Sequence, residues 1–366
     1  MSLKAHKCTL QAQAPYRTFA EVPNTLFFVT GSMSSFYQSP VWITINQTVY
    51  QKPSFSCTIG GQTYHGVTKW KRLLGKQFQR YMLHGFSLPT WEQYTQEFHE
   101  VLTQLKRDYG KGFGDLFFQL GIVNVFDSRP TSQVKTPETR TALLTQRHAI
   151  EQNFKTWYDL VPSWREHMPQ ATIVLDLTQT HAQRTQDLSD SGKRYLNKGK
   201  KAELEFVQAT DADWGPFWDV RYTTAFDKGF AVVPKEHFLR LRDFLVSEKQ
   251  GALFLLKQGN EIVSGSVCLF REKTCVYLYG ATARAYGDIG AHYLLNRQIM
   301  ERAKAAHFTT YDLLGVSPVG EEQTHALGGV TRFKQAFGGT TLSYIGNMDI
   351  LLNPLMYKSY KLWKAK

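Results

Sequence analysis

The sequence predicts an α/β (α+β) fold with two lobes, each built on a mixed sheet. The chain has 366 residues, more than one hydrophobic core usually supports. Apolar residues make up 42% of it and aromatic residues 14%, enough to fill two cores, and this composition argues against disorder. Strand-like runs alternate with amphipathic helical stretches, and no repeat of fixed period appears.

The first lobe is predicted from an amphipathic helix and a buried strand. The stretches TLFFVTG (25–31) and VWITINQTVY (41–50) are interpreted as two strands, or as a short helix and a strand. Thr90 is expected to cap a helix that runs to about Arg107, because apolar residues recur along one face at helical spacing. DLFFQLGIVNVF (115–126) is predicted to be a buried strand, followed by a polar loop that leads into a helix.

The second lobe has a clearer order of elements. We predict strands at 171–177 and 203–210 with a polar helix between them, then two helices, three successive strands from Gly251, a helix over 291–306 and a last strand, TTYDLLG (309–315). Gly259-Asn260 between two of these strands is a hairpin signal. This order is typical of an N-acyltransferase lobe of the GNAT type, and two tandem GNAT-like lobes would explain the length. We place lobe 1 at residues 1–162, with 345–366 returning to it, and lobe 2 at residues 163–344.

The charge balance points to anionic partners. Lys and Arg number 43 against 31 Asp and Glu, a net charge of +12, which suggests RNA, nucleotides or acidic lipid head groups. A basic enzyme without such a partner would carry the same charge. The four cysteines show neither CxxC spacing nor a His at metal-ligand intervals, so no metal site and no disulfide scaffold are expected. A reducing cytoplasm fits best, and because no apolar run reaches the length of a membrane span, contact with the inner membrane face would be peripheral.

Three ordered blocks of sequence carry a family resemblance. They are ATIVLDL (171–177) with KRYLNKGKKAE (193–203), then YLYGATARAYGDIGAHYLLNRQIMERAKAAHFTTYDLLGV (277–316), and RFKQAFGG (332–339) followed by YIGNMDILLNP (344–354). These blocks resemble the Fem family of peptidoglycan-bridge aminoacyltransferases. FYQSPVW (36–42) is similar to the family's Gln-Ser-x-x-Trp motif, so the resemblance spans most of the chain. The heptad stretch needed for a helical arm is absent, so the chain resembles the shorter, armless branch, and a monomer is expected.

The resemblance implies an enzyme, an acyltransferase that forms peptide bonds. Fem enzymes move an amino acid from aminoacyl-tRNA to the stem peptide of a cell-wall precursor. The implied partners are therefore aminoacyl-tRNA, as donor substrate rather than cofactor, and a nucleotide-linked or lipid-linked peptidoglycan precursor. No cofactor and no metal are required.

Lys334 is the main catalytic candidate. Aminoacyl transfer from an ester to an amine passes through a tetrahedral oxyanion, and a fixed cation or N–H donor there contributes about 100- to 1,000-fold in rate. The resemblance assigns the matching lysine to this position, with Phe333 holding the backbone beside it. Arg332 is assigned to substrate binding, as a phosphate contact. A surface lysine at a helix start, a core Phe333 and a solvated Arg332 are the alternatives.

Two further candidates come from strands. Asp312 lies at a strand end, where it can accept a proton or orient the attacking amine, although a purely structural role for a carboxylate there is as common. Tyr277 and Tyr279 are expected to share one face of their strand, because side chains alternate along it. The resemblance places a tyrosine of this strand near the acceptor, and Tyr279 is our choice over simple core packing.

The remaining candidate residues are predicted to bind the substrates. Helical spacing places a basic stripe on one face, suited to the phosphates of tRNA or to a pyrophosphate, unless it is only a solvated surface. The resemblance adds acceptor contacts from a helix of the second lobe and from the Gln-Ser-x-x-Trp motif. The stripe consists of Arg194, Lys198 and Lys201, and the acceptor contacts are Arg221, Tyr222 and Trp42.

The chain departs from the family pattern at two places. The acid and proline expected after the first-lobe strand are replaced by Gly121 and Ile122, so the general base stays open. No basic residue follows Trp42 before Lys52, which weakens the case for a uridine diphosphate acceptor. The main rival is an acyl-CoA-dependent N-acyltransferase, but Ile289 occupies a position where its pyrophosphate loop needs Gly or Ala. A non-enzymatic RNA-binding protein is the second rival.

Overall fold

The chain folds into two compact units. The computed structural model describes residues 37–59, 62–73, 76–87, 94–112, 114–164 and 166–364. Among these, unit 1 comprises the residues up to Ser128, Thr136–Gln170 and those from Leu342 onward, and unit 2 comprises Arg129–Lys135 and Ala171–Thr341. The sequence-based lobes were divided at residues 162 and 344. The predicted strand at 25–31 lies outside the described residues.

Unit 1 contains a sheet in the order β1-β2-β3-β4-β12, with β5 paired to β12. Strands β1, β2 and β3 are antiparallel neighbours, whereas β4 runs parallel to β3. Its elements are α2 (Pro40–Thr44), a π-helix (Ile45–Val49), β1 (Ser54–Ile59), β2 (Gln62–Leu73), β3 (Lys76–Phe86), α3 (Tyr94–Tyr109), β4 (Asp115–Pro130), α4 (Pro137–Tyr158), β5 (Leu160–Pro162), β12 (Thr340–Leu351) and α11 (Pro354–Lys364).

Unit 2 contains strands in the order β6-β11-β10-β9-β8-β7. Here β7 to β10 form an antiparallel meander, and β11 runs parallel to β10. Its elements are β6 (Ala171–Asp176), α5 (His181–Gln186), α6 (Asp190–Lys200), β7 (Glu205–Gln208), α7 (Trp214–Lys228), α8 (Lys235–Ser247), β8 (Gly251–Gln258), β9 (Glu261–Arg271), β10 (Thr274–Thr282), α9 (Ala291–Ala305), β11 (Thr310–Asp312) and α10 (Gly328–Gln335); short 3-10 turns lie at Gln133–Lys135, Asp211–Asp213 and Arg284–Tyr286.

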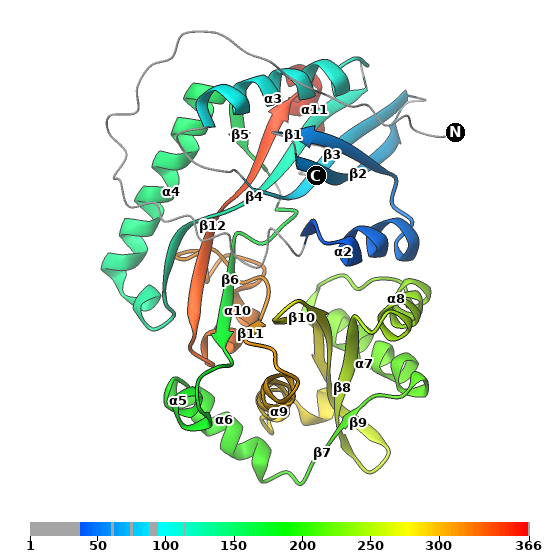
Figure 1. Cartoon of the computed structure of the whole chain (residues 1–366), viewed down its shortest axis with the longest axis vertical. Helices are drawn as coiled ribbons and strands as arrows, with labels where there is room; N and C mark the ends of the chain where they lie inside the picture. The colour runs from blue at the N-terminus through cyan, green and yellow to red at the C-terminus, as the bar shows by residue number, and fades with distance from the viewer. Residues whose placement is uncertain are drawn as a thin grey trace. The chain divides into compact units, whose positions relative to one another are not determined.

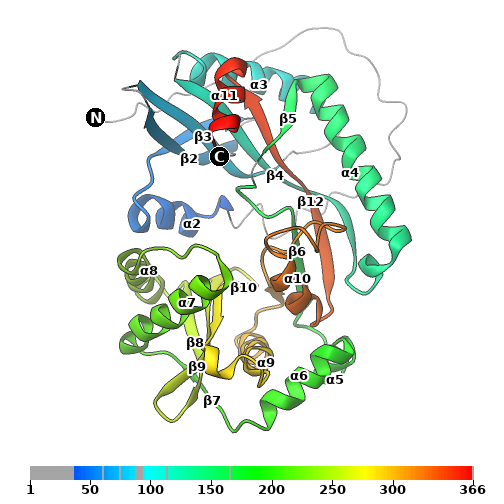
Figure 2. The ribbon, with the colours of Figure 1, turned by 180° about the vertical axis from the view of Figure 1, so that it is seen from behind.

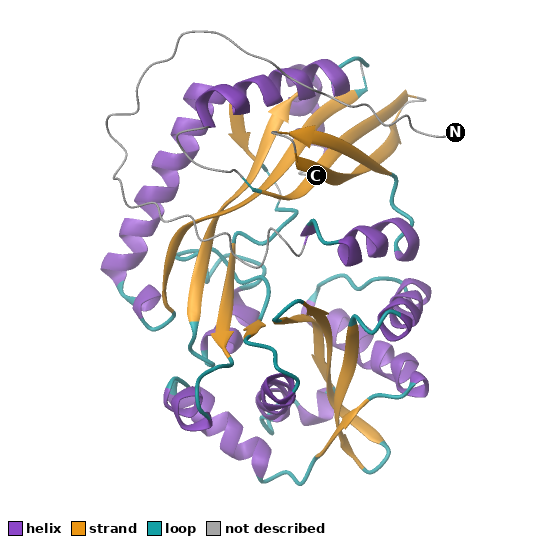
Figure 3. Cartoon of the chain, in the orientation of Figure 1, coloured by secondary structure: helices purple, strands orange, loops and turns teal. Residues whose placement is uncertain are grey.

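The two units repeat one arrangement. In each, three antiparallel strands are followed by a helix and then by a strand parallel to the third: β1-β2-β3, α3, β4 in unit 1 and β8-β9-β10, α9, β11 in unit 2. A parallel neighbour needs such a crossover, because a tight turn can only reverse the chain. Figure 1 shows both repeats, and Figure 3 shows helices beside the strands of each unit. The predicted tandem of GNAT-like units with mixed sheets is therefore confirmed.

Unit 1 has helices on both faces of its sheet. On β4, the ring of Phe118 contacts that of Tyr109 on α3, whereas the ring of the preceding residue, Phe117, contacts that of Tyr357 on α11. Figure 2 shows α11 from behind. Because side chains alternate along a strand, α3 and α11 cover opposite faces. None of the helices among the described residues is both long and apolar enough to cross a membrane.

Residues 41–49 are helical, so the strand predicted over 41–50 is wrong. Ser39 caps α2 by accepting a hydrogen bond from the Trp42 amide at 3.2 Å, and Pro40 occupies the first turn, where a missing N–H costs nothing. The helix then continues as the π-helix to Val49. The cap at Ser39 and the proline in the first turn therefore favour a helix more strongly than the β-branched residues favour a strand.

Candidate active site

Lys334 is buried inside unit 2. It lies in the last turn of α10, and its side chain is 4% exposed. Its Nζ donates to the carbonyl oxygens of Leu314 at 3.1 Å and Gly315 at 2.7 Å. Lys334 thus lies on a short helix, and a loop that follows β11 fixes its ammonium group.

Asp312 holds the loop that faces Lys334. The carboxylate is buried and accepts hydrogen bonds from the Thr172 hydroxyl at 2.6 Å and from the Leu314 amide at 2.8 Å. Leu314 has a φ of 58°, a left-handed conformation that is strained for a residue with a Cβ. Because Asp312 anchors this turn, it positions the two carbonyl groups that bind the lysine.

Burial also changes the proton affinity of Lys334. Loss of solvent lowers its pKa from 10.5 to about 7, and the charge of Asp312 opposes part of that decrease. An ammonium group has three N–H donors, and two of them bind Leu314 and Gly315. A negative charge that develops nearby would favour the protonated form and could accept the third donor.

A hydrogen-bonded chain of three side chains lies beside the lysine. The Nζ of Lys334 is 5.4 Å from the centre of the Tyr277 ring. The Tyr277 hydroxyl is 2.9 Å from Nε2 of His292, and Nδ1 of His292 is 2.7 Å from the Ser264 hydroxyl. Burial lowers the pKa of His292 to about 3, so the ring is neutral, with one nitrogen donating and the other accepting.

Phe333 closes this cluster from the side of α10. Its ring is 5.1 Å from that of His292 and 5.0 Å from that of Tyr293. Sequence reasoning missed His292 and Ser264. The sequence carries no direct signal for these two residues. In the structure, a Cβ at Gly280 would lie 1.9 Å from the Tyr277 hydroxyl, so only glycine leaves room for the tyrosine.

Tyr279 faces a different neighbourhood from Tyr277, so the prediction of a shared face is wrong. The register of β10 shifts between these two residues, because a β-bulge breaks the alternation. Tyr279 instead lies under Arg221, whose guanidinium carbon is 4.2 Å from the ring centre. Arg221 is buried, whereas Tyr222 is 52% exposed and stacks on Trp218 at 5.1 Å. The two neighbouring residues of α7 therefore point in different directions.

The basic residues of α6 lie on the outside of unit 2. Arg194, Lys198 and Lys201 are all exposed, and Lys198 forms an ion pair with Asp288 at 2.6 Å. The inner side of α6 approaches the end of α10 closely, since a Cβ on Gly192 would lie 2.5 Å from the Ala336 carbonyl oxygen. Arg332 of α10 is also exposed. The stripe and Arg332 thus belong to the unit that holds Lys334.

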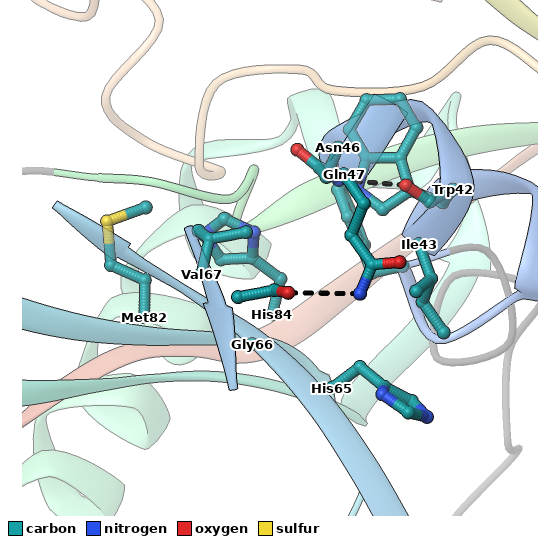
Figure 4. A pocket seen from close by; sticks show the side chains of 11 residues that line it. Trp42, Ile43, Asn46, Gln47, His65, Gly66, Val67, Met82 and His84 are labelled. Carbon is teal, nitrogen blue, oxygen red and sulfur yellow. Dashed lines mark hydrogen bonds between the residues drawn. The ribbon is translucent and has the colours of Figure 1, made fainter. Parts of the chain in front are cut away.

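Trp42 is the one assigned residue that belongs to unit 1. Its ring meets that of Tyr37 edge to face at 5.8 Å, and its carbonyl oxygen accepts a hydrogen bond from Asn46 at 2.9 Å. It lines a small pocket next to β2 and β3, in which Figure 4 shows the side chains of His65 and His84. The described residues contain no group of three His, Cys, Asp or Glu side chains placed to hold a metal ion.

Comparisons with known proteins identify a family match in the C-terminal part of the chain. Residues 247–365 match the model of the FemAB family. A lipid II:glycine glycyltransferase of Staphylococcus epidermidis is 28% identical over 95 residues, which cover 26% of this chain and 23% of that protein. The chain therefore aligns with less than a quarter of the length of this curated relative.

Solved structures share the fold over most of the chain. FemX superposes with a TM-score of 0.61 at 14% identity, covering 88% of this chain and 94% of FemX. A conserved protein of unknown function from Bacteroides thetaiotaomicron superposes with a TM-score of 0.50 at 10% identity, covering 87% and 95% of the two chains. The predicted resemblance to the Fem family is thus confirmed: the C-terminal third of the chain matches the FemAB family, and the chain has the fold of FemX.

Proposed function

We propose that the protein transfers an amino acid from aminoacyl-tRNA to the stem-peptide amine of a peptidoglycan precursor, as a step of cell-wall cross-bridge synthesis. The FemAB match and the glycyltransferase relative support this class of reaction. The observation that carries the proposal is the buried ammonium group of Lys334, with two donors bound to carbonyl groups and a third left for a substrate oxygen.

The chemistry assigns Lys334 to the oxyanion. The acceptor amine attacks the ester carbonyl, a C–N bond forms, and the carbonyl oxygen becomes negatively charged. Lys334 stabilises that charge until the C–O bond breaks and the ribose hydroxyl leaves with a proton. A lysine-like acceptor amine, with a pKa of about 10.4, must first lose one proton to the solvent; after the attack, the hydroxyl next to the ester can accept a second proton from the amine while it gives its own proton to the leaving ribose oxygen. Asp312 acts through Lys334, because it favours the charged form and anchors the loop.

The other candidates bind substrate. In this scheme Tyr279 and Arg221 position the acceptor, with Tyr222 at the exposed side of α7. The basic stripe of α6 and Arg332 hold phosphates of the tRNA, which are recognised without reading bases. Trp42, which belongs to unit 1, is a further acceptor contact in this scheme. The scheme needs no metal, and the enzyme would act as a monomer in the cytoplasm, at the inner membrane face if the precursor is lipid-linked.

The donor distinguishes this proposal from its rivals. The purified protein is incubated with cell-wall precursors and, separately, with charged total tRNA or with acetyl-CoA, and products are identified by mass spectrometry. The proposal predicts an aminoacylated precursor only in the tRNA reaction, and none with the Lys334→Met variant. Product from the thioester alone would establish the acyl-CoA reaction instead. Binding of tRNA without any product would favour the RNA-binding protein.

A further inference from the structure

A cavity of about 150 Å³ lies in unit 2 at the C-terminal end of α9, apart from the candidate active site. His292, a member of that site, lies in the first turn of α9, whereas Arg302, which lines the cavity, lies in the last turn. At a rise of about 1.5 Å per residue, the two residues are about 15 Å apart along the helix axis. The proposed transfer reaction does not use this cavity.

Buried apolar side chains form the inner wall of the cavity. Phe254 of β8 is 3% exposed, and Cys275 of β10 and Ile299 of α9 are fully buried. These residues belong to the main hydrophobic core cluster of unit 2. Protein cores are close-packed and contain few voids larger than a water molecule. A cavity of this size in such a wall is therefore apolar surface that the fold leaves open to a ligand.

The turn after α9 holds an aromatic ring at the outer wall. His307 has a φ of 64°, and the Phe308 amide donates to the carbonyl oxygen of Ala303 at 3.0 Å, which closes the helix end. The ring of Phe308 lies 5.2 Å from that of Phe270, which lies 6.5 Å from that of Phe254. Three phenyl rings thus border the cavity, and their faces and edges suit contact with a further aromatic ring.

The rim of the cavity carries a cation. Arg302 and Gln208 line it and are both exposed. Among the residues that the structure describes, the side chain of Arg302 forms no ion pair, and the adjacent acid, Glu301, is instead bound by Arg184 and Arg297. A guanidinium group presents its N–H donors as a planar fork, which matches the two oxygens of a carboxylate.

We propose that this cavity binds a small carboxylic acid that carries one aromatic ring. An engineered apolar cavity of about 150 Å³ in another protein binds benzene, so one ring fills a space of this volume. The ring would lie among Phe254, Phe270 and Phe308, and the carboxylate at the rim, where Arg302 can bind both oxygens. The inference does not depend on the proposed transfer reaction.

Methyl NMR of the full chain tests the site directly. A methyl group of Ile299 lies in the buried wall, and the Ile299→Val variant identifies its signal. The probes are benzoate and phenylacetate, with benzyl alcohol as a ring without charge and acetate as a carboxylate without a ring. We expect at least one aromatic acid to shift the Ile299 signal at millimolar concentrations and acetate to leave it in place. Benzyl alcohol should bind about tenfold more weakly, because it lacks the charge-assisted contact.

Two variants separate the contribution of the carboxylate from that of the ring. Arg302→Gln should weaken binding of the aromatic acid by about tenfold and leave binding of benzyl alcohol unchanged. Ala303→Leu places a larger side chain in the cavity and should weaken binding of both ring probes by about tenfold or more. The matched control is Lys200→Gln, which removes an exposed cation from α6 of the same unit and should change neither affinity.

Several results would overturn the proposal. One is an Ile299 signal that neither aromatic acid shifts, and another is benzyl alcohol that binds as tightly as the acids. A third is equal weakening of acid binding by Arg302→Gln and Lys200→Gln. If Ala303→Leu does not fold, the wild-type Ile299 signal still locates the ligand, and Arg302→Gln, at an exposed position, still tests the carboxylate contact. No tRNA or precursor is present, so these results are independent of the proposed function.

Discussion

Two regions of the molecule hold cations in different surroundings. In unit 2, Lys334 is surrounded by acceptors: two carbonyl oxygens bind it and Asp312 lies close by. In unit 1, Lys52, Lys69 and Arg80 face one another around a cavity. In the first arrangement, the proposed reaction uses the third donor of the ammonium group for a charge that exists only in the transition state. The second brings like charges together on neighbouring strands.

The largest expected effect comes from removing the cation of unit 2. Lys334→Met should lower the rate of aminoacyl transfer by about 100- to 1,000-fold, because the oxyanion loses its donor. Single-turnover rates with charged tRNA measure this, corrected for the folded fraction. Arg332→Gln, on the same helix but exposed, is the matched control and should lower the rate far less. Equal losses per folded molecule in the two variants would contradict a specific role of Lys334 at the oxyanion.

Removing the carboxylate of Asp312 would leave Lys334 without its neighbouring negative charge, like the two lysines of unit 1, whose pKa values are lowered by burial and by nearby cations. Asp312→Asn takes away the charge that raises the pKa of Lys334, so less of the lysine is protonated at pH 7. A decrease of one unit in that pKa lowers the protonated fraction at pH 7 from about one half to about one tenth, roughly a fivefold loss of the ammonium form. We therefore expect transfer about fivefold slower than in the wild type at pH 7, and a smaller difference between the two proteins at lower pH. A loss that is the same at every pH would show that Asp312 acts only by anchoring the loop.

The dependence of stability on pH should differ between wild type and Lys334→Met. The folded pKa of Lys334 is lowered to about 7, so between this value and 10.5 the unfolded state binds more protons than the folded state. The wild-type free energy of unfolding therefore rises with pH in this window, relative to the variant. The difference should grow by about 2 kcal/mol from pH 7 to pH 9. Urea unfolding of both proteins at several pH values measures it, and a constant difference would contradict the buried ammonium group.

The smallest expected effect concerns the exposed cations of α6. Arg194→Gln removes one phosphate contact, so tRNA affinity should fall by a few-fold, and the slope of log K against log salt should decrease by about 0.7 to 0.9. Fluorescence anisotropy with labelled tRNA at several salt concentrations checks this. Lys155→Gln, on the other unit, serves as control and should leave the slope unchanged. An unchanged slope in Arg194→Gln would make the stripe a solvated surface.

Local signals were sufficient for much of unit 2. Helix α9, Ala291–Ala305, matches the predicted 291–306 because apolar residues recur at helical spacing. The hairpin between β8 and β9 turns at Gly259, whose φ of 58° is a conformation that glycine adopts without strain. In unit 1, the β-branched run after Pro40 favoured a strand, and the start signal of α2 decided for a helix instead.

The site itself depends on contacts between distant parts of the sequence. The bulge before Tyr279 adds a residue that a pattern of alternation cannot reveal. The burial of Lys334 depends on a turn at Leu314, twenty residues earlier, and nothing in RFKQAFGG shows it. His292 and Tyr277 become partners only when α9 packs against β10. Through the family resemblance, the sequence predicted Lys334 as the catalytic candidate, but it did not predict the two carbonyl groups that bind its side chain.

The most direct test of the central claim is the pH dependence of single-turnover transfer from pH 5.5 to pH 8.5. If the acceptor amine must lose a proton and Lys334 must keep one, the logarithm of the wild-type rate should rise with a slope of one up to about pH 7 and then level off. Lys334→Met should be slower and rise with a slope of one throughout. A wild-type profile that continues to rise through pH 7, parallel to that of Lys334→Met, would contradict an ammonium group at the oxyanion.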